Sequence, residues 1–166
     1  MTATPTLNVL VLCTGNSARS ILGEALVGHV SGGRARGFSA GSNPAGKVNP
    51  VALETLAKHG VDIDEVRSKH WDEFSAPGAP SMDIVITVCD SAGRETCPVW
   101  PGAPVQVHWG IPDPAHVEPI EARREAFERA FQTLKRRLEA FFAKPVERMT
   151  PADRKALLQK IAAEDR

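Results

Sequence analysis

Apolar runs alternate with amphipathic stretches along most of this sequence. Four runs are apolar or β-branched and bounded by turn residues, which predicts strands at residues 7–12, 36–40, 81–88 and 105–108. Between the first two runs, apolar side chains recur at helical spacing from Ser17 until Gly32, and residues 50–58 form a second helical segment. Because strand and helix alternate, we expect a doubly wound α/β domain with a four-stranded parallel sheet flanked by helices.

A long amphipathic helix follows the predicted sheet. Its apolar face repeats at four-and-three spacing through Phe127, Phe131, Leu134, Leu138 and Phe141. A solvated face is expected for its arginines, which are Arg123, Arg124, Arg129, Arg136 and Arg137. We therefore predict one domain over residues 1–144 and a tail over residues 145–166. A helix start at Thr150 makes a helical tail plausible, and the pattern leaves open whether this helix packs or frays.

Composition limits the expected partners and the cellular location of this chain. Its 166 residues suit one domain, and its 20 basic and 20 acidic side chains give no net charge. A global attraction to nucleic acid or to an anionic membrane is therefore not expected. The first residues lack a basic signal region, and no apolar stretch approaches the roughly 20 residues that span a bilayer. We expect a cytoplasmic protein, and its odd count of three cysteines favours reactive or buried thiols over a secreted disulfide framework.

The segment CTGNSARS, from Cys13 to Ser20, lies between the first predicted strand and the first predicted helix. A loop of this length can curl so that its backbone N–H groups converge on an anion, with the helix N-terminus adding positive potential. We expect Gly15 to supply the positive φ and Arg19 to bind two oxygens of a tetrahedral oxyanion. The expected oxyanion contacts are Thr14, Gly15, Asn16, Ser17, Ala18, Arg19 and Ser20.

The same donors would stabilise a thiolate at Cys13. Such surroundings lower a cysteine pKa from ~8.5 to a range of about 3.5 to 7.5, which would make Cys13 a nucleophile aimed at the anion. Ser20 is expected to donate a hydrogen bond to this sulfur, and Asn16 to hold the loop through its amide. The alternative is that Cys13 is a small buried residue at a strand end and Arg19 is a surface charge. This alternative does not explain why the Cys–Arg spacing, the glycine and the strand–helix context occur together.

Two further chemical groups follow strands of the predicted sheet. Cys89 comes directly after the third strand, and Asp113 follows the fourth within Pro112-Asp113-Pro114. Carboxyl ends of parallel strands share one edge, so both should lie near Cys13. Cys97 lies across a polar loop from Cys89, which permits thiol–disulfide exchange among three sulfurs. The alternatives are that Cys89 and Cys97 are core residues without a redox role, and that Asp113 only forms a turn.

CTGNSARS resembles the phosphate loop of the low-molecular-weight protein tyrosine phosphatases and of the arsenate reductases that share their fold. VITVCDSAGRETCPVWPG and VHWGIPDP look like the redox segment and the acid loop of thioredoxin-coupled arsenate reductases. The resemblance implies reduction of arsenate to arsenite, with thioredoxin as electron donor and no bound cofactor or metal. It makes Cys13 the nucleophile, Arg19 the oxyanion clamp, Cys89 and Cys97 the second and third redox cysteines, and Asp113 the general acid.

The sequence departs from the family pattern at three places. Ala18 replaces a fourth, dispensable cysteine, which leaves the relay intact. The spacing from Cys89 to Cys97 is one residue longer, so the loop rearrangement is open. Some relatives bind potassium through an acidic residue that aligns with Lys69, whose ammonium can replace the ion; Asn16, Glu24 and Ser39 match the other ligands.

Other functions fit the sequence less well. A tyrosine phosphatase would need Cys13 and Asp113 but no relay, and the chain has no tyrosine for the aromatic pair that follows the acid in many such enzymes. A metalloid-binding module would leave Arg19 without a purpose. Residues 41–47 have P-loop spacing, but Val48 stands where the magnesium-binding hydroxyl belongs. The histidines are scattered, so we expect no zinc site.

Overall fold

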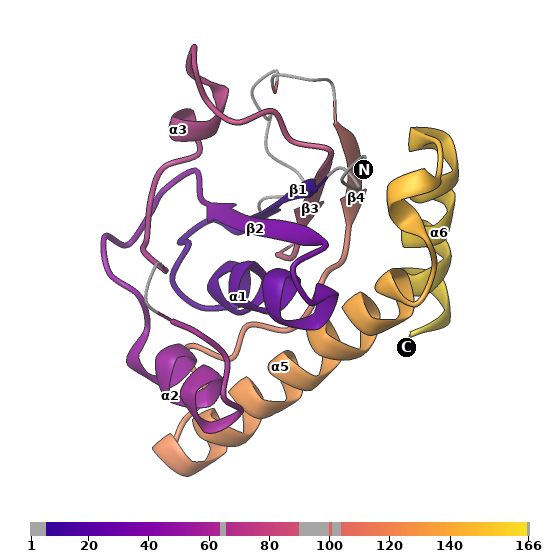
Figure 1. The fold of residues 1–166 in the computed structure, drawn as a ribbon. Coiled ribbons are helices and arrows are strands. Elements are labelled where there is room, and N and C mark those ends of the chain that lie inside the picture. The colour runs from indigo at the N-terminus through magenta and orange to yellow at the C-terminus, as the bar shows by residue number, and fades with distance from the viewer. Residues whose placement is uncertain (1–5, 64–65, 90–99, 101–103, 166) are drawn as a thin grey trace.

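The computed structural model describes residues 6–63, 66–89, 100 and 104–165 of the chain. Four parallel strands form one sheet in the order β2-β1-β3-β4 (Figure 1). Their bounds are Leu7–Leu12 for β1, Ala35–Ala40 for β2, Ile84–Thr87 for β3 and Val105–His108 for β4. All three pairings are parallel and in register to the last residue, so the segments that leave the strands begin at one edge. The predicted doubly wound fold is confirmed.

Local signals set the ends of the helices. The helices are α1 (Arg19–Ser31), α2 (Pro50–Lys58), α3 (Asp72–Ser75), α5 (Ile120–Phe142), the 3-10 turn η1 (Val146–Arg148) and α6 (Pro151–Glu164). Gly32, in the left-handed conformation, ends α1. Asn49 caps α2 and Thr150 caps α6, each ahead of a proline in the first turn. The short α3 was not predicted, since four residues carry no periodic pattern.

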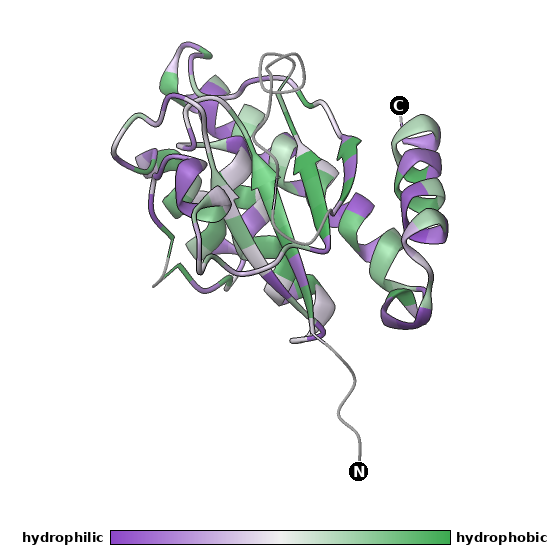
Figure 2. Cartoon of the chain, turned by 90° about the horizontal axis from the view of Figure 1, so that it is seen from above, coloured by the Kyte–Doolittle hydropathy of each residue, from purple (hydrophilic) through white to green (hydrophobic). Residues whose placement is uncertain are grey.

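Side chains on the two faces of the sheet enter two separate cores. Val9 and Val11 of β1 face the larger core, where α1, α2 and α5 pack. Leu10 and Leu12 face the smaller one, which contains Trp71, Phe74, Met82 and Trp100. Alternation along a strand produces this division, because successive side chains point to opposite faces. Figure 2 shows the hydrophobic strands at the centre of the chain.

Two predicted boundaries differ from the structure by more than one residue. The third strand begins at Ile84 rather than Ser81. The Asp83 carboxylate accepts the backbone N–H of Asn8 at 2.8 Å, so a side chain takes the place of a backbone hydrogen bond between the strands. Helix α1 begins at Arg19 rather than Ser17, because Ala18 has a non-helical backbone (φ −124°, ψ −85°). The first correction shortens a strand, and the second lengthens the loop that follows β1.

The tail packs as a helix. Leu158 and Ile161 of α6 are buried in the larger core, and α6 lies beside the edge strand β4 (Figure 1). The solvated face predicted for the α5 arginines is wrong for Arg137, which is 7% exposed because it pairs with Asp165 at the end of α6. The division at residue 144 stays a prediction. Within the described residues, none of the helices is long and apolar enough to cross a membrane.

Candidate functional site

Three of the predicted site residues lie beyond the carboxyl ends of neighbouring strands. Cys13 follows β1 directly, Cys89 lies two residues beyond β3, and Asp113 lies five residues beyond β4. The backbone keeps the first two segments together, because the N–H of Val88 donates to the carbonyl of Leu12 at 3.0 Å. The parallel order of the strands therefore brings residues 76 positions apart in the sequence to one place.

The oxyanion loop, residues 14–18, is held by its carbonyl groups. Three backbone N–H groups donate to these carbonyls at 2.9–3.0 Å, and they belong to Asn43, Ala45 and Asn49. Since C=O and N–H of one peptide point in opposite directions, the N–H groups of these peptides face away from the 43–49 segment. The N–H groups of residues 17–19 find no acceptor among the described residues. This arrangement favours binding of an anion.

The segment that supports the loop was missed in the sequence, where residues 41–47 were weighed only as a nucleotide-binding motif. Gly41 shows why a glycine is needed there: a Cβ at this position would lie 2.3 Å from the carbonyl oxygen of Thr14. Such a contact is not possible without moving the loop. The Gly-Ser-Asn-Pro run could have indicated a tight supporting loop, but the sequence carries no signal for what it supports.

Asn16 anchors the loop from behind. Its backbone has φ 42°, so the left-handed residue is Asn16 and not Gly15 as expected. Its fully buried amide donates to Ser20 Oγ at 2.8 Å and Ser39 Oγ at 2.9 Å, and accepts from the backbone N–H of Lys69 at 2.8 Å. Asn16 thus holds the oxyanion loop through three side-chain hydrogen bonds, as predicted. No hydrogen bond joins Ser20 to Cys13 in the described structure, because the hydroxyl faces Asn16.

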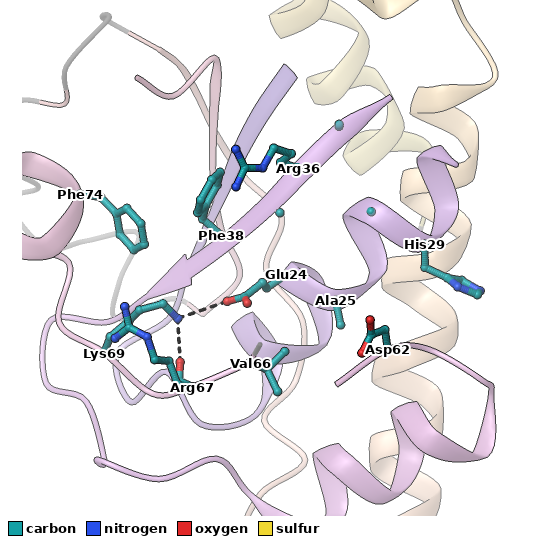
Figure 3. Close-up of a pocket in the computed structure, with 13 residues that line it drawn as sticks. Glu24, Ala25, His29, Arg36, Phe38, Asp62, Val66, Arg67, Lys69 and Phe74 are labelled. Carbon is teal, nitrogen blue, oxygen red and sulfur yellow. Dashed lines mark hydrogen bonds and ion pairs between the residues drawn. The ribbon is translucent and has the colours of Figure 1, made fainter. Parts of the chain in front are cut away.

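A buried cation completes this network. Lys69 Nζ lies 3.2 Å from Glu24 Oε1 and 3.4 Å from Ser39 Oγ, and donates to the carbonyl of Arg67 at 2.7 Å. Burial lowers the pKa of Lys69, and the charge of Glu24 acts in the opposite direction. The side chains of Lys69 and Glu24 line a pocket of about 590 Å³ between α1, β2 and residues 66–74 (Figure 3). The ammonium therefore lies within hydrogen-bond distance of Glu24 and Ser39, two of the three side chains that the resemblance assigned to a potassium site.

Cys13 and Cys89 form a contacting pair of buried cysteines. Their side chains are hydrogen-bonded, both are buried, and the backbone N–H of Thr14 donates to Cys89 Sγ at 3.3 Å. The hydrogen bond with Cys89 and burial raise the pKa of the Cys13 thiol, while the charge of Arg19 and the N–H of Gly15 lower it. The expected lowering of the pKa of Cys13 is therefore wrong for this arrangement, because the hydrogen bond with Cys89 and burial outweigh the charge of Arg19.

Arg19 lies between the oxyanion loop and the acid loop, residues 109–113. Its Nη1 donates to the carbonyl of Ile111 at 2.9 Å, and its Nη2 is 3.7 Å from Asp113 Oδ2. Its Nε is buried and has no hydrogen-bond partner among the described residues. A buried donor of this kind is costly unless an acceptor binds, which favours an oxyanion as ligand.

Asp113 makes the turn contact expected of it and lies beside Arg19, while its role as general acid stays a prediction. Its Oδ1 accepts the backbone N–H of Ala115 at 2.9 Å, which is a turn contact, while Oδ2 faces Arg19. The side chain is 41% exposed and therefore in contact with solvent. Cys97 lies outside the described residues.

Comparisons with known proteins agree with this geometry. The pattern of the low molecular weight phosphotyrosine protein phosphatases matches residues 8–152. An arsenate reductase from Halalkalibacterium halodurans is 34% identical over 134 residues, which cover 80% of this chain and 93% of that protein. Solved structures with this fold include an arsenate reductase in its phosphate-binding state (TM-score 0.65, 25% identity, 83% of this chain and 98% of that chain). They also include a thioredoxin-dependent arsenate reductase from Corynebacterium glutamicum (TM-score 0.56, 27% identity, 83% of this chain and 64% of that chain). The chain thus belongs to the low molecular weight phosphotyrosine protein phosphatase family.

Proposed function

We propose that this protein is an arsenate reductase that converts arsenate to arsenite and is regenerated by thioredoxin. The observation that carries the proposal is that Cys89 Sγ accepts the backbone N–H of Thr14, the residue after Cys13, and contacts the Cys13 thiol beside Arg19. A phosphatase needs one nucleophilic sulfur, whereas a reductase needs a second sulfur within reach of the first. Similar proteins named arsenate reductases, one of them thioredoxin-dependent, support the same assignment.

Binding of arsenate would activate Cys13. The oxyanion competes with Cys89 Sγ for the N–H of Thr14, which now donates to that sulfur. Displacement of Cys89 would remove the hydrogen bond that raises the pKa of Cys13, while Arg19 remains to stabilise the thiolate. The remaining oxyanion contacts are the backbone N–H groups of residues 14–20 and the guanidinium of Arg19. Substrate binding and thiolate formation are thus coupled.

The proposed chemistry transfers two electrons from two thiols. The Cys13 thiolate forms a bond to arsenic, and a hydroxyl group leaves as water after Asp113 protonates it. The Cys89 thiolate then attacks Cys13 Sγ, and the electron pair of the sulfur–arsenic bond remains on arsenic, which leaves as arsenite. Cys97 attacks Cys89 Sγ and releases the Cys13 thiolate. Thioredoxin finally reduces the disulfide between Cys89 and Cys97. A reducing compartment keeps such thiols available, so we propose the cytoplasm as location.

The decisive measurement is arsenate-dependent oxidation of NADPH with thioredoxin and thioredoxin reductase present. We expect consumption well above the arsenate-free control. Equal rates with and without arsenate, together with rapid hydrolysis of p-nitrophenyl phosphate, would instead identify a tyrosine phosphatase that forms a phosphocysteine at Cys13.

Serine variants separate the steps of the relay. Cys13→Ser should abolish both arsenate reduction and slow phosphate-ester hydrolysis, whereas Cys89→Ser should abolish only the reduction. Cys97→Ser should release about one arsenite per enzyme and stop as a disulfide between Cys13 and Cys89. Peptide mapping after arsenate treatment should find Cys89 joined to Cys97 in the wild type. Wild-type turnover in both Cys89→Ser and Cys97→Ser contradicts the relay.

A further inference from the structure

The C-terminal helix α6 closes the outer side of strand β4. Leu158 is fully buried and Ile161 is 8% exposed, and both belong to the larger core. Arg136 and Arg137 of α5 bind the carboxylate of Asp165 at 2.7 Å, which fixes the end of α6. Most of α6 lies beyond residue 152, where the match to the family ends. This chain therefore adds a firmly packed element to the common fold.

One side chain joins α6 to the acid loop. Trp109 is the first residue after β4 and is fully buried. Its indole N–H donates at 3.0 Å to the carbonyl of Leu158, which lies in the middle of α6. Its backbone N–H donates to the carbonyl of Thr87 at 2.7 Å. Trp109 is thus fixed on one side by the sheet and on the other by the tail.

The residues that follow lead directly to the candidate site. Ile111, two positions on, is 6% exposed, and its N–H donates to the carbonyl of Val88 at 3.0 Å. Its carbonyl accepts from Arg19, and Asp113 follows after one proline. A displacement of Trp109 would therefore move both the acceptor of Arg19 and the backbone that carries Asp113.

We propose that α6 positions the acid loop through Trp109, which makes Trp109 a positioning residue for the reaction. The inference rests on the proposed function, because Asp113 acts there as the acid. The oxyanion loop is held independently, by Asn16 and the 43–49 segment. Loss of the indole contact should therefore impair the step that needs Asp113 more strongly than binding of the anion, which the oxyanion loop and the remaining contacts of Arg19 maintain.

The test is Trp109→Phe, which keeps an aromatic ring and removes the N–H donor. We expect kcat for arsenate reduction to fall about tenfold, since small displacements of a catalytic group have effects of this size. The Kd of inorganic phosphate, used as the probe of the oxyanion loop, should stay within about threefold of wild type. Arg136→Gln is the matched control, because it removes an exposed contact between α5 and α6 while Arg137 still binds Asp165 and holds the end of α6. It should leave kcat unchanged.

Hydrogen exchange supplies a readout that needs no activity. Amides of residues 105–113 should exchange faster in Trp109→Phe than in wild type or Arg136→Gln, while those of residues 84–88 should not change. Ile161→Ala, which loosens α6 without altering Trp109, should have the same effect on exchange and kcat. Unchanged kcat and exchange in Trp109→Phe, or an equal loss of kcat in Arg136→Gln, overturns the proposal. A wild type that reduces no arsenate contradicts the proposed function alone, because exchange still decides the structural link.

Discussion

The two sides of the oxyanion loop differ in how completely their polar groups are paired. On the rear side, Asn16 uses both amide hydrogens and its oxygen, and Lys69 has three partners. On the front side, Arg19 Nε and the N–H groups of residues 17–19 have no acceptor among the described residues. The front therefore carries donors that a ligand can satisfy, while the rear has none to spare.

This difference shows how a short loop can keep unpaired donors in place. Buried donors without partners destabilise a fold by roughly 1–3 kcal/mol each, so a flexible loop would turn them toward other acceptors. The paired rear network and the 43–49 segment oppose such a rearrangement. Donors that are already oriented lose little on binding and stabilise charge that develops in the transition state. Changes on the front should thus affect chemistry, and changes on the rear should affect both chemistry and stability.

The largest effect is expected at the front, from Arg19→Lys. A lysine cannot bind two oxygens of the oxyanion at once, so kcat/KM for arsenate should fall about ten- to a thousandfold. The melting temperature should change little, and Arg124→Lys, at an exposed ion pair with Glu54, should leave turnover unchanged. Near-wild-type kcat/KM in Arg19→Lys contradicts the assignment of this residue as the clamp.

Two variants at Asn16 probe the rear. Asn16→Gly keeps the left-handed backbone but removes three hydrogen bonds, and we expect a loss of about 2 kcal/mol in unfolding free energy. Asn16→Ala should lose about 1 kcal/mol more, because alanine also disfavours the positive φ. Both should lower kcat/KM. Urea unfolding with a parallel arsenate assay checks the pair, and equal stability of the two variants would count against strain at this position.

A smaller effect is expected from separating the two thiols. Cys89→Ala removes the hydrogen bond that raises the pKa of Cys13, so the Cys13 thiolate should form at lower pH than in the wild type. Alkylation of Cys13 by iodoacetamide, followed by peptide mass spectrometry, should show a midpoint shifted to lower pH and a faster rate at neutral pH. An unchanged alkylation profile would show that Cys89 does not control ionisation of Cys13.

The smallest effect concerns potassium. Because the Lys69 ammonium already lies between Glu24 and Ser39, we expect the melting temperature in potassium to stay within about 1 °C of that in sodium. Lys69→Ala removes this ammonium and should make stability respond to potassium. A strong, potassium-specific rise in the wild type contradicts the substitution of lysine for the ion.

Features that depend on near neighbours in the chain could be predicted from the sequence. The strands β1 and β4 and helix α2 have the predicted bounds, because apolar runs, prolines and caps act over a few residues. Cys13 and Arg19 were found because strand, loop and helix follow one another directly. The left-handed residue was misassigned to Gly15, since asparagine also tolerates this conformation and only the network around Asn16 selects it.

The sequence by itself determined the parallel α/β fold, the oxyanion loop and the edge of the sheet at which the chemistry lies. Only the tertiary structure decided which groups satisfy one another across long separations. It joined Cys89 to Cys13, Lys69 to Glu24, and Trp109 to the middle of α6. The physical reason is range: periodicity and capping depend on neighbours in the chain, whereas hydrogen bonds, burial and pKa shifts depend on neighbours in space.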